Sequence, residues 1–131
     1  MLKIKNMKKY ILLFRLDILT KEAQPTKEQM EIFMQQWIKW LDGISEKDQF
    51  AEGGNHLQYS GKVLKPGGII QEQPYFSNSE SVAGYIVVLA KSMDEATEIA
   101  KKCPILNGGN RNSVEIREAA TPQNIDEIKR K

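Results

Sequence analysis

The chain has 131 residues, a formal net charge of +2 and one cysteine, Cys103. This length suits a single domain, and one cysteine excludes both an intramolecular disulfide framework and a cysteine metal cluster. Eight of the 19 basic residues lie near the two ends, which leaves 11 basic against 17 acidic residues in the body. That sign argues against nucleic-acid binding. No apolar run approaches the roughly 20 residues of a membrane span. The single cysteine fits a reducing compartment, so the cytoplasm is the expected location.

The first predicted element is a strand over residues 9–16 (KYILLFRL). An almost continuous apolar run of this length suits a strand that is buried on both faces of a sheet. Residues 1–8 before it are expected to be a flexible lead, although Met7 is a second possible start.

A long helix is predicted next. Thr26 and Gln29 form the pattern of a capping box, and apolar residues then recur at steps of three and four, so the helix should run to about residue 43. Trp37 and Met34 are expected in the core, and Trp40 lies near the edge of the stripe. The stripe consists of Met30, Phe33, Met34, Trp37, Leu41 and Ile44.

Short strands separated by glycines follow, which indicates a β-meander. The pair Gly53-Gly54 sits inside the first of them and indicates a bulge, or close approach by another backbone or a ligand. Brief strands are predicted over residues 63–64 and 69–71. After an exposed loop, residues 84–90 form the best central-strand candidate.

A second capping pattern at Ser92 and Glu95 predicts a helix that Pro104 terminates. The alternation in Ser113–Glu118 (SVEIRE) predicts the last strand. The domain is thus expected over residues 9–119, followed by a polar tail over residues 120–131.

This order of elements predicts a ferredoxin-like α+β unit, with an antiparallel sheet and two helices on one face. Two helices cover only one face of such a sheet. The strands near residues 10–14 and 85–89 are apolar on both alternating sets, so the other face is expected to pack on a second copy. The sequence therefore predicts a homodimer that packs sheet against sheet.

Several segments together resemble the YCII-related proteins of the DGPF type over about residues 8–119. They are FRLD, GGNHL, the proline loop before Ala83-Gly84-Tyr85-Ile86-Val87, SMDEATEIAKKCPI and SVEIRE. The DGPF tetrapeptide corresponds to Glu72-Gln73-Pro74-Tyr75, with the acid lengthened and the glycine replaced. The resemblance implies a dimeric α/β barrel. Studied relatives carry a proposed His–Asp pair on other elements, which the single histidine of this chain, His56, does not allow us to place, and most members have no assigned activity.

His56, the only histidine, is the candidate catalytic residue, because imidazole exchanges protons near neutral pH and Asn55 and two glycines before it leave room for a ligand. The alternative is a histidine that hydrogen-bonds locally at a strand end. Arg15 and Asp17 should share a face at the end of the first strand. They would bind an anion, orient His56 or form a structural ion pair, and the ion pair is favoured.

Pro74 and Tyr75 form either a lip over a ligand cleft or a contact with the partner subunit. Tyr85 is expected to present its hydroxyl to the space between the sheets. Cys103 is expected to be a buried structural thiol. The candidate ligand-binding set is Arg15, Asp17, Asn55, His56, Pro74, Tyr75 and Tyr85.

No zinc constellation, phosphate-binding glycine loop or nucleophile elbow is present in the sequence, so no metal and no cofactor are predicted. The leading hypothesis is a homodimer that binds a small organic molecule in a cleft between sheet and helix, with acid–base chemistry by His56. The alternative is a non-catalytic regulatory or protein-interaction module. A third, an oxygenase-like enzyme without cofactor, rests on fold analogy alone.

Overall fold

The computed structural model describes residues 7–20, 24–107 and 112–121. Most of the expected N-terminal lead and C-terminal tail lies outside them. The elements, in chain order, are β1 (Lys8–Asp17), α2 (Lys27–Glu46), β2 (Phe50–His56), β3 (Val63–Lys65), β4 (Ile69–Gln71), β5 (Glu80–Ala90), α3 (Met93–Ala100), the 3-10 helix η2 (Pro104–Asn107) and β6 (Ser113–Glu118).

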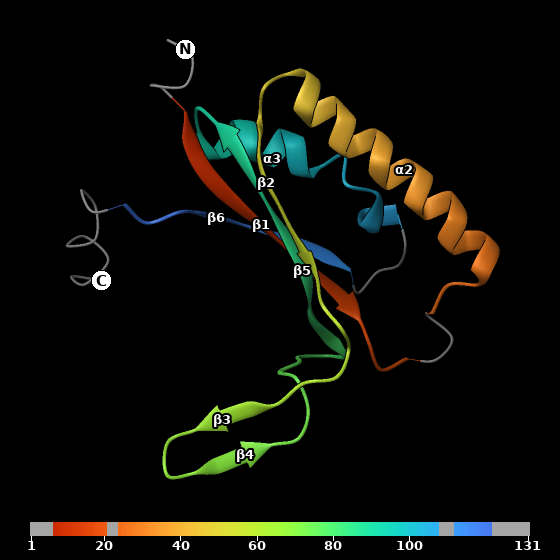
Figure 1. Cartoon of the computed structure of the whole chain (residues 1–131), viewed down its shortest axis with the longest axis vertical. Coiled ribbons are helices and arrows are strands. Elements are labelled where there is room, and N and C mark those ends of the chain that lie inside the picture. Colours follow the sequence, from red (N-terminus) through yellow and green to blue (C-terminus); the bar gives the residue numbers. More distant parts are fainter. Residues whose placement is uncertain (1–6, 21–23, 108–111, 122–131) are drawn as a thin grey trace.

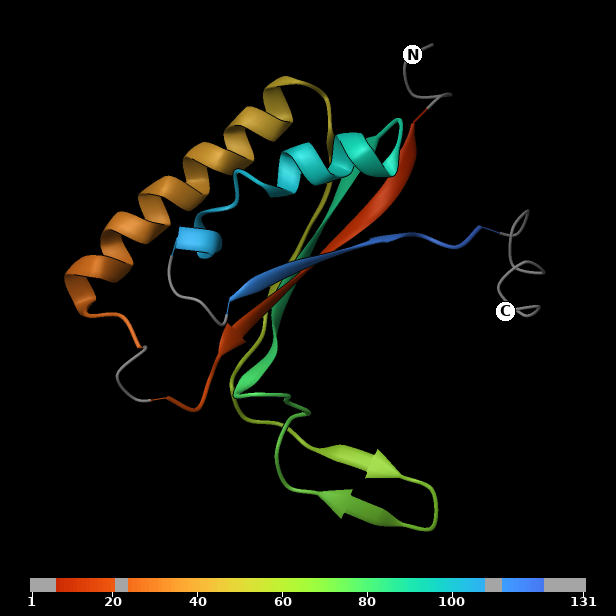
Figure 2. The ribbon, with the colours of Figure 1, turned by 180° about the vertical axis from the view of Figure 1, so that it is seen from behind.

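Four strands form the main antiparallel sheet in the order β2-β5-β1-β6. Strands β1 and β2 each pair with β5, and α2 connects them, so the chain forms a split β-α-β unit. Both helices lie on the same side of this sheet (Figures 1 and 2). The predicted ferredoxin-like α+β fold is therefore confirmed.

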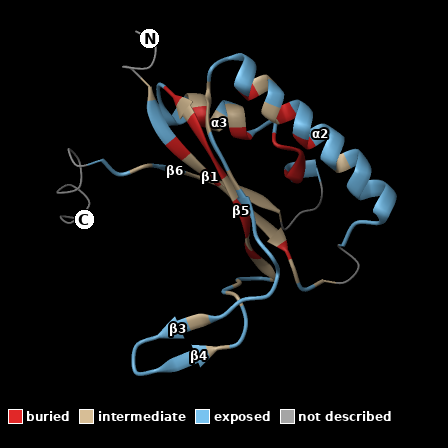
Figure 3. Ribbon diagram, in the orientation of Figure 1, coloured by how far each residue is buried: buried red, intermediate tan, exposed pale blue. Residues whose placement is uncertain are grey.

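The hairpin β3–β4 differs from a simple meander. Its strands pair only with each other, as a separate two-stranded sheet, and the hairpin extends beyond the end of the main sheet (Figure 1). Most of its surface is exposed (Figure 3). The sequence predicted the strands correctly but not that they leave the sheet.

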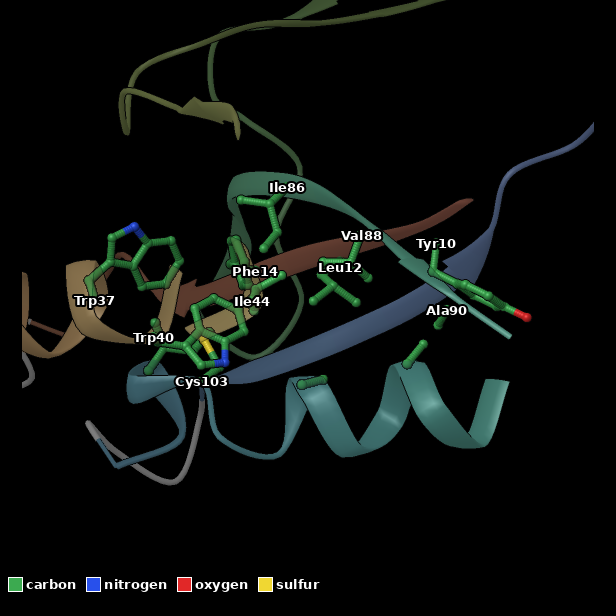
Figure 4. Close-up of a cluster of buried hydrophobic side chains, with 13 residues drawn as sticks. Tyr10, Leu12, Phe14, Trp37, Trp40, Ile44, Ile86, Val88, Ala90 and Cys103 are labelled. Carbon is green, nitrogen blue, oxygen red and sulfur yellow. The ribbon is translucent and has the colours of Figure 1, made fainter. Parts of the chain in front are cut away.

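The core lies between the main sheet and the helices. In β1 every second residue from Tyr10 to Phe14 is buried, which is the period of a strand with one covered face. In β5 the residues on this side are buried too, and Val87 on the other side is only 5% exposed. Figure 4 shows these side chains together with Trp37, Trp40 and Cys103. Cys103 is 1% exposed, as expected for a structural thiol, and burial raises its pKa to about 12. The sheet contributes Tyr10, Leu12, Phe14, Ile86, Val88 and Ala90.

Helix α2 begins with the predicted capping box: the Gln29 amide donates to the Thr26 hydroxyl over 3.1 Å, and the Thr26 amide donates to the Gln29 side chain over 2.8 Å. The helix continues past Gly43 to Glu46. The core prediction for Met34 is wrong, because its side chain is 39% exposed, whereas Trp40, expected near the edge of the apolar stripe, is only 8% exposed. The reason is tertiary, since the Trp40 indole donates to the Ile99 carbonyl over 3.1 Å and turns that side of α2 toward α3.

The bulge predicted at Gly53-Gly54 is present, because the β2–β5 register shifts between Glu52 and Asn55. Gly54 has a φ of +58°, and a Cβ built on it would lie 1.8 Å from the Tyr85 carbonyl oxygen. The glycine is thus required by the backbone of the neighbouring strand.

We expect Gly54→Ala to lower the free energy of unfolding by about 2 kcal/mol or more, because both the backbone conformation and the β5 carbonyl oppose a Cβ. Gly43→Ala is the matched control. It lies inside α2 with no atom within 4 Å of its Cβ position, so it should stabilise by about 0.5–1 kcal/mol. Urea unfolding followed by tryptophan fluorescence measures both, and a neutral Gly54→Ala would contradict the assigned bulge.

Candidate functional site

The strand register brings three of the predicted ligand residues onto the face of the sheet that the helices do not cover. Asn55 pairs with Tyr85, Tyr85 with Leu13, and Leu13 with Glu115, which makes one row across all four strands. Residues paired in register share a face. Arg15 lies two residues after Leu13 along β1, so it shares the same face beside this row. We call this side of the sheet the open face.

The open face combines apolar residues with one ionic cluster. The Arg15 guanidinium donates to Glu115 Oε1 through Nη2 at 2.7 Å and through Nε at 3.3 Å. Arg117 Nη1 donates to Glu115 Oε2 at 3.3 Å. Around these charges lie the side chains that alternate onto the same face of the two central strands: Ile11, Leu13, Tyr85, Val87 and Leu89.

The hydrogen bond from Arg15 holds the pKa of Glu115 below its usual range, and the bond from Arg117 acts in the same direction. The carboxylate therefore stays ionised between two arginines, one of which it binds through two nitrogens. The sequence alone did not place Glu115 beside Arg15, because that contact depends on the pairing of β6 with β1.

Asp17 has another role than the one favoured from the sequence. Its Oδ1 accepts hydrogen bonds from the amides of Leu19 at 3.0 Å and Thr20 at 2.9 Å, which turns the chain as it leaves β1. Arg15 pairs with Glu115 and not with Asp17, so the expected ion pair between them is wrong. Alternation along β1 does not identify the ion-pair partner of Arg15, because that partner, Glu115, comes from the neighbouring strand β6.

His56 lies on the opposite side of the sheet from Arg15. It pairs in register with Gly84, next to Phe14 on the helix-covered face. Its ring centre is 5.5 Å from that of Trp37, which stacks on Phe33. The side chain is exposed, and no hydrogen bond or ion pair joins its imidazole to another residue of the described ranges. Within one chain, Arg15 therefore does not orient His56.

The loop before β5 is held at its base. The buried Ser81 hydroxyl donates to the Tyr75 carbonyl oxygen. Ser77 and Glu80 exchange backbone hydrogen bonds of 2.9 Å around a tight turn whose two central residues, Asn78 and Ser79, have positive φ. The Tyr75 side chain is 69% exposed, as expected for a loop aromatic.

Pro74 lines a shallow hollow of about 460 Å³ at the base of the β3–β4 hairpin, together with Gly61 and Lys62. Neither His56 nor Tyr75 lines this hollow. A larger groove, of about 870 Å³, lies between α2 and α3 and contains none of the predicted site residues. Sequence reasoning missed it, and its one local signal was a glycine, Gly43, inside an amphipathic helix.

In the described part of the chain, no three His, Cys, Asp or Glu side chains gather closely enough to bind a metal ion. No helix within residues 7–20, 24–107 and 112–121 is long and apolar enough to span a membrane.

In a comparison against protein families, the YCII-related domain matches residues 15–120. The chain belongs to the YCII-related domain family. The match covers α2, α3, the strands from β2 to β6 and the last three residues of β1. It therefore includes Arg15, Tyr85 and Glu115 of the open face, whereas Ile11 and Leu13 lie before it. A search of curated proteins found no match. The DGPF type of this YCII-related domain stays a prediction from Glu72–Tyr75.

Glu115→Gln should change how stability depends on pH. The folded pKa of Glu115 lies below its unfolded value, so its stabilisation is complete above the unfolded pKa and is lost as the pH falls through the folded pKa. We expect the variant to be less stable by about 0.5–1 kcal/mol at neutral pH, and the difference to disappear in acid.

The measurement is urea unfolding from neutral to acidic pH at one protein concentration. Glu118→Gln, on the same strand, is the control, because no described residue forms an ion pair with its carboxylate. Equal pH dependence in the two variants would show that the arginine contacts do not stabilise the fold.

Proposed function

We propose that this YCII-related protein is a homodimer in which the open faces of two sheets pack together and enclose a site for a small organic ligand. The observation that carries the proposal is the open face itself: its central strands present apolar side chains that neither helix covers. Burying such a face against a second copy is the most economical way to remove it from water.

Symmetry fits this arrangement. In a twofold dimer the same patch contacts itself, so the Asn55–Tyr85–Leu13–Glu115 row of one subunit would face its copy. Because Glu115 is already paired with Arg15 and Arg117, its charge would enter the interface compensated. An internally paired charge is far less costly to bury than a lone one.

The ligand would bind where polar groups interrupt the apolar surface. Arg15, Asn55 and Tyr85 supply a guanidinium, an amide and a phenol on one face, which suits a molecule that carries a carboxylate or similar polar group. Arg15 has further N–H groups besides the two that bind Glu115. Asp17 would support this end of β1 through its turn, and would not contact the ligand.

Acid–base chemistry by His56 is the second candidate. It is supported by an exposed imidazole that lies against Trp37, on an edge strand between sheet and helix. His56 and the inter-sheet site lie on opposite faces of the sheet, so the seven predicted ligand residues belong to more than one site. Pro74 and Tyr75 belong to the loop before β5. They would contact either site from that loop, within their own subunit or across the dimer interface.

A non-catalytic interaction module is the alternative, and the β3–β4 hairpin favours it. Leu64, Ile69 and Ile70 are 74%, 58% and 53% exposed, and Tyr75 is close by in sequence. A two-stranded hairpin is marginally stable by itself, so contact with another chain would stabilise it.

We propose a cytoplasmic location for the protein, because its single thiol, Cys103, is buried and unpaired.

Leu13→Lys should convert the dimer to a monomer, because it places an ammonium group in the centre of the open face. Sedimentation equilibrium at micromolar concentration measures the mass, with circular dichroism to check folding. Ile38→Lys, at a 54% exposed position on α2, is the control and should stay dimeric. A wild-type protein with the mass of one chain would refute the homodimer.

A thermal-shift screen against metabolites separates the two ligand sites. A compound at 100 times its dissociation constant stabilises the fold by about 2.7 kcal/mol. We expect the shift to be reduced in Tyr85→Phe, which removes only a hydroxyl, and retained in His56→Ala. The reverse pattern would move the site to His56. No shift with any compound would favour the interaction module.

A further inference from the structure

The groove between α2 and α3 has the features of a second binding site. Its volume is about 870 Å³, and it is lined by residues of α2 and α3. Both helices lie on the side of the sheet opposite the open face (Figure 2). Its floor is apolar and fixed: Trp40 is 8% exposed, Ile44 is 5% exposed, and the Trp40 indole donates to the Ile99 carbonyl over 3.1 Å. The groove therefore has a rigid aromatic base.

Gly43 keeps one wall of the groove open. Gln36, Trp40, Gly43 and Lys47 follow one another at steps of four, three and four, so they lie along one side of α2. A glycine inside a helix costs about 0.5–1 kcal/mol relative to alanine. No atom lies within 4 Å of a Cβ built on Gly43, so packing within the chain does not require a glycine there. A molecule bound in the groove would need the space that Gly43 leaves, and this would explain why a glycine is present.

The rim of the groove carries an excess of unpaired positive charge. The acids include Glu95, which accepts from Gln49 Nε2 at 2.8 Å and from the Lys91 amide at 3.3 Å, and Glu98, which pairs with Lys101 at 2.6 Å. Glu46 is the third. No ion pair joins any ammonium group of the rim to a residue of the described ranges. These rim lysines are Lys39, Lys47, Lys91 and Lys102.

We propose that this groove binds a small organic anion, with its apolar body on the Trp40–Ile99 floor and its carboxylate, sulfonate or phosphate among the rim lysines. An apolar floor with a few convergent charges is the usual composition of a ligand site. Cationic groups without partners attract an anion at a lower cost than paired ones, because no existing contact has to break. This site is independent of the inter-sheet site and of His56.

The test uses two dyes that differ by one charge. 8-Anilinonaphthalene-1-sulfonate carries a sulfonate, and N-phenyl-1-naphthylamine has the same rings without it. Fluorescence titration of the folded full-length protein gives a dissociation constant for each. Gly43→Leu should fill the groove, and should raise the dissociation constant of both dyes by about tenfold or more. Urea unfolding should show it to be at least as stable as the wild type, because leucine is a better helix former.

The charge is tested by the double variant Lys47→Gln/Lys102→Gln. It should raise the dissociation constant of the sulfonate dye by about tenfold and change that of the uncharged dye by less than about twofold. Lys27→Gln/Lys65→Gln, which removes two exposed lysines outside the groove, is the matched control and should change neither.

Three results would overturn the proposal: no binding of the sulfonate dye to the wild type, unchanged binding in Gly43→Leu, or equal loss of both dyes in the rim-lysine variant. The last result would indicate a groove for neutral molecules.

Discussion

The antiparallel pairing of β1 with β5 in the middle of the main sheet is the constraint on which the other features depend. It places Tyr10 opposite Val88 and Leu12 opposite Ile86 on the side that the helices cover. A one-residue slip would exchange the two faces of the sheet. The same register fixes Leu13 beside Tyr85, and so determines which residues lie on the open face.

The edge strand β2 pairs with β5, and two glycines allow the two backbones to come close together. Gly54 adopts a positive φ where β5 comes close, and a Cβ on Gly84 would lie 2.8 Å from the Asn55 carbonyl oxygen. After the bulge, ordinary strand alternation puts the next two residues on different sides, with Asn55 on the open face and His56 against Trp37. The candidate residues are thus divided between two surfaces.

The helical layer is organised by the contact of Trp40 with α3 rather than by a simple amphipathic stripe. The indole hydrogen bond to Ile99 joins the two helices across the core and forms the floor of the groove outside it. The first half of α2 is left with exposed apolar residues such as Met30 and Ile32 (Figure 3). The protein therefore presents three separate surfaces: the open face, the groove and the β3–β4 hairpin.

The sequence by itself determined the order of the elements, the capping box at Thr26 and the bulge at Gly54, because these depend on periodicity and local backbone chemistry. It also indicated the buried thiol of Cys103. Only the tertiary structure decided that Arg15 pairs with Glu115 rather than Asp17, and that His56 lies on the other face from Arg15. Those outcomes depend on which strands are neighbours and on their register, and residues 100 positions apart carry no local signal of either.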